Sequence, residues 1–265
     1  MRRNLGPETP ELIEKKINEG RGRGRLADYK PWILVGEFRS RGEQKILVGR
    51  KTGRSHHYFS KLESDYHSMV EFDPRILDIR EQFPILPLAE TMKVAKANGI
   101  KHPAVGDLPK VITFDFMLTM LDNNRQVHLV RSVKRSQDLT DNRVLQKLEL
   151  ERRICERLGY EYKIVTEKDM PTQRLKNLSF LWSWTKSDLP PPQPEFANAF
   201  LSELGRCDNE EPLVTQLEAV AKRLNISRHL SIWLFKYLGW ERKIRVDMTA
   251  RLELGLPHKF QIANG

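Results

Sequence analysis

The chain has 265 residues and a net charge of +10 at pH 7, and 39% of its residues are hydrophobic. This composition predicts a soluble globular protein of one large or two ordinary domains, with an anionic partner, nucleic acid first. No stretch approaches the ~20 apolar residues that cross a membrane, and no secretory signal follows Arg2 and Arg3. Cys155 and Cys207 lie far apart, which disfavours a zinc site or a disulfide framework. We therefore expect a cytoplasmic location.

The basic residues concentrate in residues 21–54, which carry ten Lys or Arg against three acidic residues. Such clustering favours a phosphate-binding surface over an ordinary solvated face, although the Gly-Arg run at 21–25 fits either equally well. His56 and His57 are adjacent. Neighbouring histidines in a strand point to opposite faces and seldom chelate one ion, so a structural or phosphate-contacting role is expected for this pair. The expected DNA-contacting residues are Arg21, Arg23, Arg25, Arg50, Lys51, Arg54, His56 and His57.

Hydrophobic periodicity and capping residues predict alternating helices and strands in the first part of the chain. This pattern indicates an α/β fold with helices packed on a mixed sheet. The expected helices span 10–19, 60–72 and 141–158, and a short helix follows residue 86. The expected strands span 32–38, 45–49, 75–86 and 160–165, with a further strand pair in 111–134.

The pair within 111–134 is a hairpin, because two β-branched and aromatic runs flank Asp122-Asn123-Asn124. A turn centred between Asn123 and Asn124 pairs Asp115 with Ser132 and places Lys134 on the same face. An acid and an ammonium there suit a divalent metal and a scissile phosphate. An ordinary surface Asp–Lys pair is the alternative.

Two further acids are candidates for the same site. Glu63 lies on the flank of the packed face of helix 60–72, but it is also the third residue of a Ser-x-x-Glu capping box. Glu151 falls within the apolar stripe of helix 141–158, where a carboxylate is costly unless paired or bound to metal. A salt bridge to a Lys or Arg at the edge of the core is the alternative for Glu151.

The second part of the chain is mostly helical. A helix is expected at 172–186, and the proline-rich run at 189–194 forms a stiff spacer. Helices are then expected near 195–205, 212–224 and 227–238, followed by a strand at 243–248. Residues 217–227 resemble the first helix and turn of a helix-turn-helix, with the strand as a wing, although short helical domains give similar patterns. The predicted organisation is a domain at 1–188, a linker at 189–195 and a winged-helix-like domain at 196–265.

The acid–acid–x-Val-Lys series of Glu63, Asp115 and Ser132-Val133-Lys134 resembles the core of restriction-endonuclease-like nucleases. Surrounding words resemble the TnsA endonuclease subunits of heteromeric bacterial transposases over about residues 8–185. These words are His56-His57, Leu77-Asp78-Ile79-Arg80-Glu81-Gln82-Phe83-Pro84, Lys101-His102-Pro103, Thr113-Phe114-Asp115-Phe116 and Lys147-Leu148-Glu149-Leu150-Glu151-Arg152-Arg153.

The resemblance implies a Mg²⁺-dependent nuclease, with Mn²⁺ as a substitute, that cuts the 5′ ends of a transposon. A TnsB-type transposase would cut the 3′ ends, and a TnsC-type AAA+ ATPase would contact the C-terminal domain. Carried onto this chain, the metal ligands are Glu63, Asp115 and the carbonyl of Val133. Lys134 would assist the attacking water, and Glu151 would fill an additional acidic position. Family members often have Gln or Glu at Ser132, which makes this serine a doubtful ligand.

Two other functions remain open from the sequence. One is a stand-alone restriction or repair nuclease, which would not need the C-terminal helical module. The other is a DNA-bridging subunit with weak or no catalysis, which Ser132 favours. Nucleotide hydrolysis and serine-esterase chemistry are unsupported, because the chain has neither a Walker-type glycine-rich loop nor a G-x-S-x-G motif.

Overall fold

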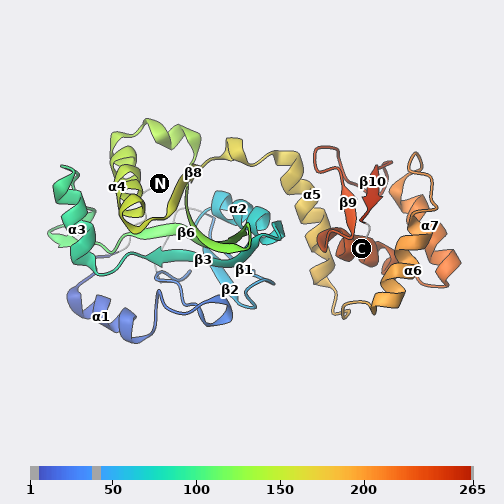
Figure 1. Cartoon of the computed structure of the whole chain (residues 1–265), viewed down its shortest axis with the longest axis horizontal. Coiled ribbons are helices and arrows are strands. Elements are labelled where there is room, and N and C mark those ends of the chain that lie inside the picture. Colours follow the sequence, from blue (N-terminus) through green and yellow to red (C-terminus); the bar gives the residue numbers. More distant parts are fainter. Residues whose placement is uncertain (1–5, 38–42, 264–265) are drawn as a thin grey trace. The chain divides into compact units, whose positions relative to one another are not determined.

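The computed structural model describes residues 6–37 and 43–263. They belong to two compact units, Met1–Met170 and Pro171–Gly265, which are described separately (Figure 1). Phe38, Arg39 and Arg41, which fall within the expected strand at 32–38 and the basic segment, lie outside the described residues.

The N-terminal unit is α/β, as predicted. Its helices are α1 (Pro10–Asn18), η1 (Leu26–Asp28), α2 (Lys61–Phe72), α3 (Leu88–Ala97), η2 (Ser136–Thr140), α4 (Asn142–Leu158) and η3 (Glu167–Asp169). Its strands are β1 (Lys45–Val48), β2 (Ser55–Tyr58), β3 (Ile76–Pro84), β4 (Ala104–Val105), β5 (Leu108–Pro109), β6 (Thr113–Asp122), β7 (Arg125–Val133) and β8 (Glu161–Val165).

The central sheet has the strand order β3-β6-β7-β8 and is mixed. Strands β3, β6 and β7 are antiparallel, and β8 runs parallel to β7. The β6–β7 hairpin has the predicted register, because its terminal pair is Asp122 and Arg125. Asn123 and Asn124 have φ of 45° and 61°, the left-handed backbone that a two-residue hairpin turn requires.

Both faces of this sheet are covered. On one face, Met117 and Val130 belong to a buried cluster with Leu150, Ile154 and Cys155 of α4. On the other face, the ring of Phe116 contacts the rings of Tyr58 and Tyr66 from β2 and α2. Figure 1 shows α4 and α1 on opposite sides of the sheet. The hairpin is therefore enclosed between helices.

The strand expected at 32–38 is wrong over its described part. Residues 32–37 form bends and a turn, which the Glu37 N–H closes by donating to the Leu34 carbonyl at 3.2 Å. Trp32 and Ile33 are nevertheless buried, in a cluster with Phe59 and Val111. The apolar run thus fills the core as a loop, a case that periodicity cannot distinguish from a buried strand.

Helix ends follow the sequence signals. The hydroxyl of Ser60 accepts the Glu63 N–H at 3.2 Å and begins α2, and the carboxylate of Asp141 accepts the N–H groups of the first turn of α4. Helix α4 ends at Gly159, which has φ of +71°. This left-handed cap satisfies the last carbonyls of the helix and suits glycine because it has no Cβ.

The C-terminal unit contains α5 (Thr172–Trp182), η4 (Ser183–Lys186), α6 (Pro194–Leu204), α7 (Leu213–Leu224), α8 (Arg228–Trp240), β9 (Ile244–Val246) and β10 (Phe260–Ile262). Helices α7 and α8 are joined through Asn225, a left-handed residue with φ of 52°, and Ser227 caps α8. Strands β9 and β10 pair antiparallel. Two consecutive helices and a strand pair thus lie in this unit, and its identity as a winged helix stays a prediction. Across the described residues, no helix has the length and apolar character needed to span a bilayer.

The division between the units requires a correction, because it lies at Met170 and not at the proline-rich run. Helix α5 belongs to the C-terminal unit. The amide of Asn177 donates to the Ala250 carbonyl at 2.7 Å and accepts the Leu252 N–H at 3.2 Å. The ring of Trp184 packs edge-on against Trp233 of α8. These contacts hold 171–188 on the helical unit, so the prolines separate α5 from α6 within it.

Replacing Gly159 by Ala is expected to destabilise the protein by roughly 1 kcal/mol, because a Cβ disfavours the left-handed backbone. A Cβ built there meets no atom within 4 Å, so the cost is conformational and not steric. Urea unfolding would measure it. Gly255→Ala is the control, since that site is equally open and its φ is not positive. Equal stability of the two variants would contradict this account of the cap.

Candidate active site

Asp115 and Lys134 meet at the end of the β6–β7 hairpin, as the register predicts. The Asp115 carboxylate is 4% exposed, and its Oδ2 atom accepts the Val133 N–H at 2.9 Å. The Lys134 ammonium donates to the same Oδ2 at 2.5 Å and to the Val133 carbonyl at 2.9 Å. The pair is thus largely buried and joined to the strand backbone. It is not the exposed surface pair that the sequence allowed.

Glu63 is also buried, at 4% exposure, and does more than cap α2. Its Oε1 accepts the Ser60 hydroxyl at 3.1 Å, and its Oε2 accepts the Phe59 N–H at 3.1 Å. The same Oε2 accepts the side-chain amide of Gln82 at 3.4 Å. Gln82 lies on β3 between Glu81 and Phe83, which pair with Phe116 and Phe114.

Gln82 therefore links the helix that carries Glu63 to β3, the strand that pairs with the one carrying Asp115. Hydrophobic periodicity missed Gln82, because it gives no signal for a polar residue inside a buried strand. In the sequence, Gln82 is marked only by its position within residues 77–84, a segment that resembles the TnsA endonucleases.

Ser132 and Glu151 form a second buried pair beside this one. The Ser132 hydroxyl donates to Glu151 Oε2 at 2.5 Å, and the Tyr162 hydroxyl donates to the same oxygen at 3.4 Å. Lys147 lies 3.6 Å from Oε1, which is the salt bridge that the sequence offered as the alternative. Burial, and then the charge of Glu151, raise the pKa of Tyr162 well above its usual range, so this phenol stays protonated. The hydroxyl of Ser132 is therefore engaged as a hydrogen-bond donor to Glu151.

The oxygen atoms around Lys134 suit a divalent cation. The ammonium is held by a carboxylate oxygen of Asp115 and by the Val133 carbonyl, so these two oxygens already gather around a positive charge. Carboxylate and carbonyl oxygens are the ligands that Mg²⁺ prefers. Among the described residues, no group of three or more His, Cys, Asp or Glu side chains is arranged to hold a metal. A metal site here would combine the carboxylates of Glu63 and Asp115 with the carbonyl oxygen of Val133.

The basic segment divides into a buried and an exposed part. The Arg54 guanidinium, with its side chain 8% exposed, donates to both carboxylate oxygens of Glu81 at 2.8 and 2.7 Å. His56 is fully buried between Glu81 and Thr52, at 2.8 and 2.7 Å. His57 accepts the Val35 N–H at 3.0 Å. These contacts hold β2, β3 and the loop before β2 together, and contact of these residues with DNA stays a prediction.

The other basic residues are more accessible. Arg23, Arg25 and Arg50 are exposed, and Lys51 is half-buried. Arg21 forms ion pairs with Glu19 at 2.8 Å and Glu37 at 2.5 Å, which reduce its availability. Arg25 hydrogen-bonds Gln126 at 3.2 Å, and 54% of its side chain remains exposed. Arg23, Arg25 and Arg50 are therefore the cations best placed to meet a phosphate.

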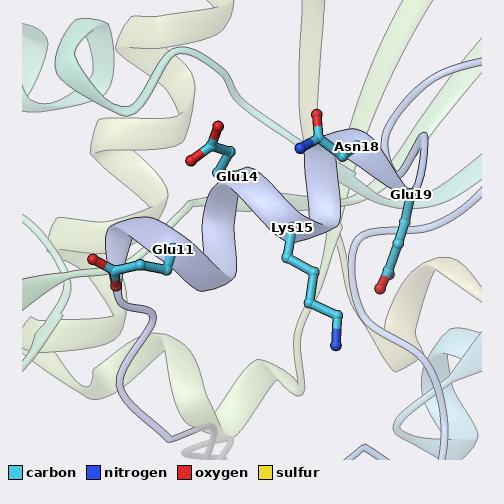
Figure 2. A pocket seen from close by; sticks show the side chains of 5 residues that line it. All are labelled: Glu11, Glu14, Lys15, Asn18 and Glu19. Carbon is cyan, nitrogen blue, oxygen red and sulfur yellow. The ribbon is translucent and has the colours of Figure 1, made fainter.

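A shallow hollow on α1 is separate from this site. Figure 2 shows the side chains that line it, all projecting from α1 or the residue after it. They are Glu11, Glu14, Lys15, Asn18 and Glu19. None of the sequence-predicted site residues lies among them, and each is exposed. The hollow has no buried polar group and does not form part of the candidate site.

The fold and the site together define a class of protein. A mixed sheet flanked by helices carries an acid and a lysine on its central hairpin, with a further acid from the preceding helix. This is the architecture of a restriction-endonuclease-like domain.

Residues 73–167 match the family model described as TnsA-like endonuclease N terminal. The chain is also 38% identical over 171 residues to the transposon Tn7 transposition protein TnsA of Escherichia coli. That match covers 64% of this chain and 62% of the relative. Residues 73–167 are thus similar to the N-terminal domain of TnsA-like endonucleases, and the resemblance found in the sequence is confirmed. The chain spans less than two thirds of the curated relative that it matches.

Glu81→Gln is expected to destabilise the protein by about 3 kcal/mol near neutral pH, because it leaves the buried Arg54 without its anion. Burial opposes ionisation of Glu81, but hydrogen bonds from Arg54 and His56 outweigh it and hold the pKa at about 2, below the ordinary 4.5. The stabilisation is therefore complete above pH 4.5 and is lost as the pH falls towards 2.

Urea unfolding of wild type and Glu81→Gln across this pH range would measure the effect. The difference between the two proteins should shrink as the pH falls. Glu14→Gln, at an exposed acid on α1, is the control and should match the wild type. A difference for Glu81→Gln that is independent of pH would contradict the ionised state of Glu81.

Proposed function

We propose that the protein is a Mg²⁺-dependent DNA endonuclease that cuts the 5′ ends of a transposon, on the strand that is not transferred. It would act with a TnsB-type transposase and a TnsC-type ATPase. The observation that carries the proposal is the buried contact of Asp115 with Lys134, supported by the buried carboxylate of Glu63 on the preceding helix. The TnsA-like domain at 73–167 and the transposition protein that matches the chain support the transposon as substrate.

In this proposal Glu63, Asp115 and the carbonyl of Val133 hold the metal ion. Bound Mg²⁺ supplies a lowered pKa for water and charge stabilisation at the leaving oxygen. Lys134, 2.5 Å from Asp115, lies where its ammonium can orient the attacking water and offset the charge that develops on the phosphate. The oxygen of water forms a bond to phosphorus, the bond to the 3′ oxygen breaks, and that oxygen takes up a proton. The products are a 5′ phosphate and a 3′ hydroxyl.

A DNA-bridging subunit with weak catalysis is the second candidate, and one observation favours it. Ser132 directs its hydroxyl to Glu151, which leaves the metal one neutral oxygen fewer on this strand. A stand-alone restriction or repair nuclease fits less well, because such an enzyme has no need of a C-terminal unit with consecutive helices and a strand pair.

Asp115→Ala and Lys134→Ala are each expected to lower 5′-end cleavage by about 100-fold or more, because each removes a group that acts on the phosphate or the water. The measurement is strand-resolved cleavage of transposon-end DNA with Mg²⁺ and the TnsB-type transposase present. Cleavage at the 3′ ends should persist, since it would depend on the partner transposase.

Asp107→Ala is the matched control, because Asp107 is an exposed acid in the turn between β4 and β5 of the same unit. It should cut both strands like the wild type. Persistent 5′ cleavage by Asp115→Ala would place the active site elsewhere. Wild type without 5′ cleavage, beside a partner that still cuts, would favour the bridging subunit.

Replacing Arg23 and Arg25 together by Ala is expected to weaken DNA binding and its dependence on salt. Each phosphate contact contributes about 0.9 to the slope of log K against log salt, so losing two lowers the slope by about 2. Fluorescence anisotropy with duplex DNA at several salt concentrations would measure it. The control is the double exchange of Lys93 and Lys96, which are exposed on α3 outside the basic segment. An unchanged slope for the Arg23 and Arg25 variant would remove these residues from the interface.

A further inference from the structure

The backbone of Gln82 has a left-handed conformation, which is unusual inside a strand and which packing alone does not explain. Among the described residues, those other than glycine with positive φ are Leu26, Gln82, Asn123, Asn124, Asn225 and Arg242. Gln82, at φ of +49°, is fully buried and lies inside a strand, and the other five lie outside the sheets. A left-handed conformation strains the backbone of a residue that carries a Cβ. Such strain persists only where neighbouring structure imposes it.

The strain redirects both the carbonyl and the side chain of Gln82. Its neighbours keep the ladder, since Glu81 pairs with Phe116 and Phe83 with Phe114. The Gln82 carbonyl instead accepts the Trp32 N–H at 3.2 Å. Regular alternation would place the side chain on the face of the sheet opposite that of Glu81. The amide instead reaches Glu63 Oε2 at 3.4 Å, on the helix that packs near β2 and β3.

The segment before β1 holds this distortion in place. The Tyr29 hydroxyl donates to the Glu81 carbonyl at 3.0 Å, and the Trp32 N–H takes the next carbonyl along β3. Tyr29 is 2% exposed and Trp32 is fully buried, so water does not compete for these bonds. Two consecutive carbonyls of the strand are thus bonded to one loop, which stabilises the local departure from the sheet.

A residue needed only for packing would not combine a strained backbone with a buried side-chain amide. Glycine at position 82 would remove the backbone cost, and an apolar side chain would avoid burying an amide. The glutamine instead directs a neutral amide to the buried carboxylate of Glu63, from the strand that pairs with the one carrying Asp115. A neutral amide can donate a hydrogen bond to one carboxylate while leaving both acids ionised and available to a cation.

We propose that Gln82 is a positioning residue of the metal site, whose strained backbone directs its amide to Glu63 and fixes that carboxylate relative to Asp115. The proposal rests on the proposed function, since it takes Glu63 and Asp115 as metal ligands. Gln82 would act through Glu63 and would not contact the DNA. Groups that orient metal ligands typically contribute 10–100-fold to metal affinity.

The test is Mn²⁺ binding to the full chain by isothermal titration calorimetry, with thermal unfolding of the same samples. Gln82→Gly removes the amide and relieves the backbone strain, and Gln82→Met removes the amide at nearly equal length. Both are expected to bind Mn²⁺ at least tenfold more weakly than the wild type. Gln82→Gly should nevertheless unfold at no lower temperature, because glycine accepts this φ.

Two further variants complete the experiment. Asn124→Gly makes a change to glycine at another left-handed residue, in the exposed hairpin turn, and should bind Mn²⁺ like the wild type. Asp115→Ala should lose binding. If Asp115→Ala loses binding while both Gln82 variants keep it, the role of Gln82 is overturned and the metal site stands. If the wild type binds no Mn²⁺, the metal site fails and the role of Gln82 fails with it. If Gln82→Gly binds Mn²⁺ more weakly but Gln82→Met binds it like the wild type, the role assigned to the amide is overturned.

Discussion

The register of the β6–β7 hairpin is the constraint on which the candidate site depends. Two asparagines with left-handed backbones close the turn, and each step along the ladder then fixes which residues face each other. A slip of one residue would exchange the two faces and direct Asp115 away from Lys134. The contact between these side chains, 2.5 Å long and largely buried, is therefore set by a turn at the opposite end of the strands.

Three buried carboxylates of the N-terminal unit are each paired with a cation. Asp115 is neutralised by Lys134, Glu81 by Arg54 and Glu151 in part by Lys147, so that each carboxylate has a cation within 4 Å. Burying an unpaired carboxylate would cost several kcal/mol, and pairing removes most of that cost. The Glu81 pair joins β2 to β3 and so supports the strand that carries Gln82. The structural carboxylate of Glu81 and the amide of Gln82 thus lie at adjacent positions of β3.

The two units present different surfaces to a polyanion. The N-terminal unit carries exposed arginines after α1 and before β2. In the C-terminal unit, helix α8 is mostly buried, because α5 and η4 pack against α8 through Trp184 and Trp233. Arg228 and His229, at the start of α8, remain exposed. The prolines at 190–192 therefore stiffen a connection within this unit and do not separate it from the N-terminal unit.

The sequence by itself determined the elements whose signals are local. The hairpin turn, the Ser60 and Asp141 caps, the end of α4 at Gly159 and the meeting of Asp115 with Lys134 follow from turn chemistry and periodicity, which act over a few residues. Tertiary structure alone decided the rest. Residues 32–37 became a loop that buries Trp32 and Ile33, α5 joined the C-terminal unit, and Arg54 and His56 turned inward to Glu81. The amide of Gln82 came to reach Glu63 while Tyr29 and Trp32 bind the carbonyls of its strand from a distant segment. Contacts between residues far apart in the chain leave no periodic pattern, so only the folded chain reveals them.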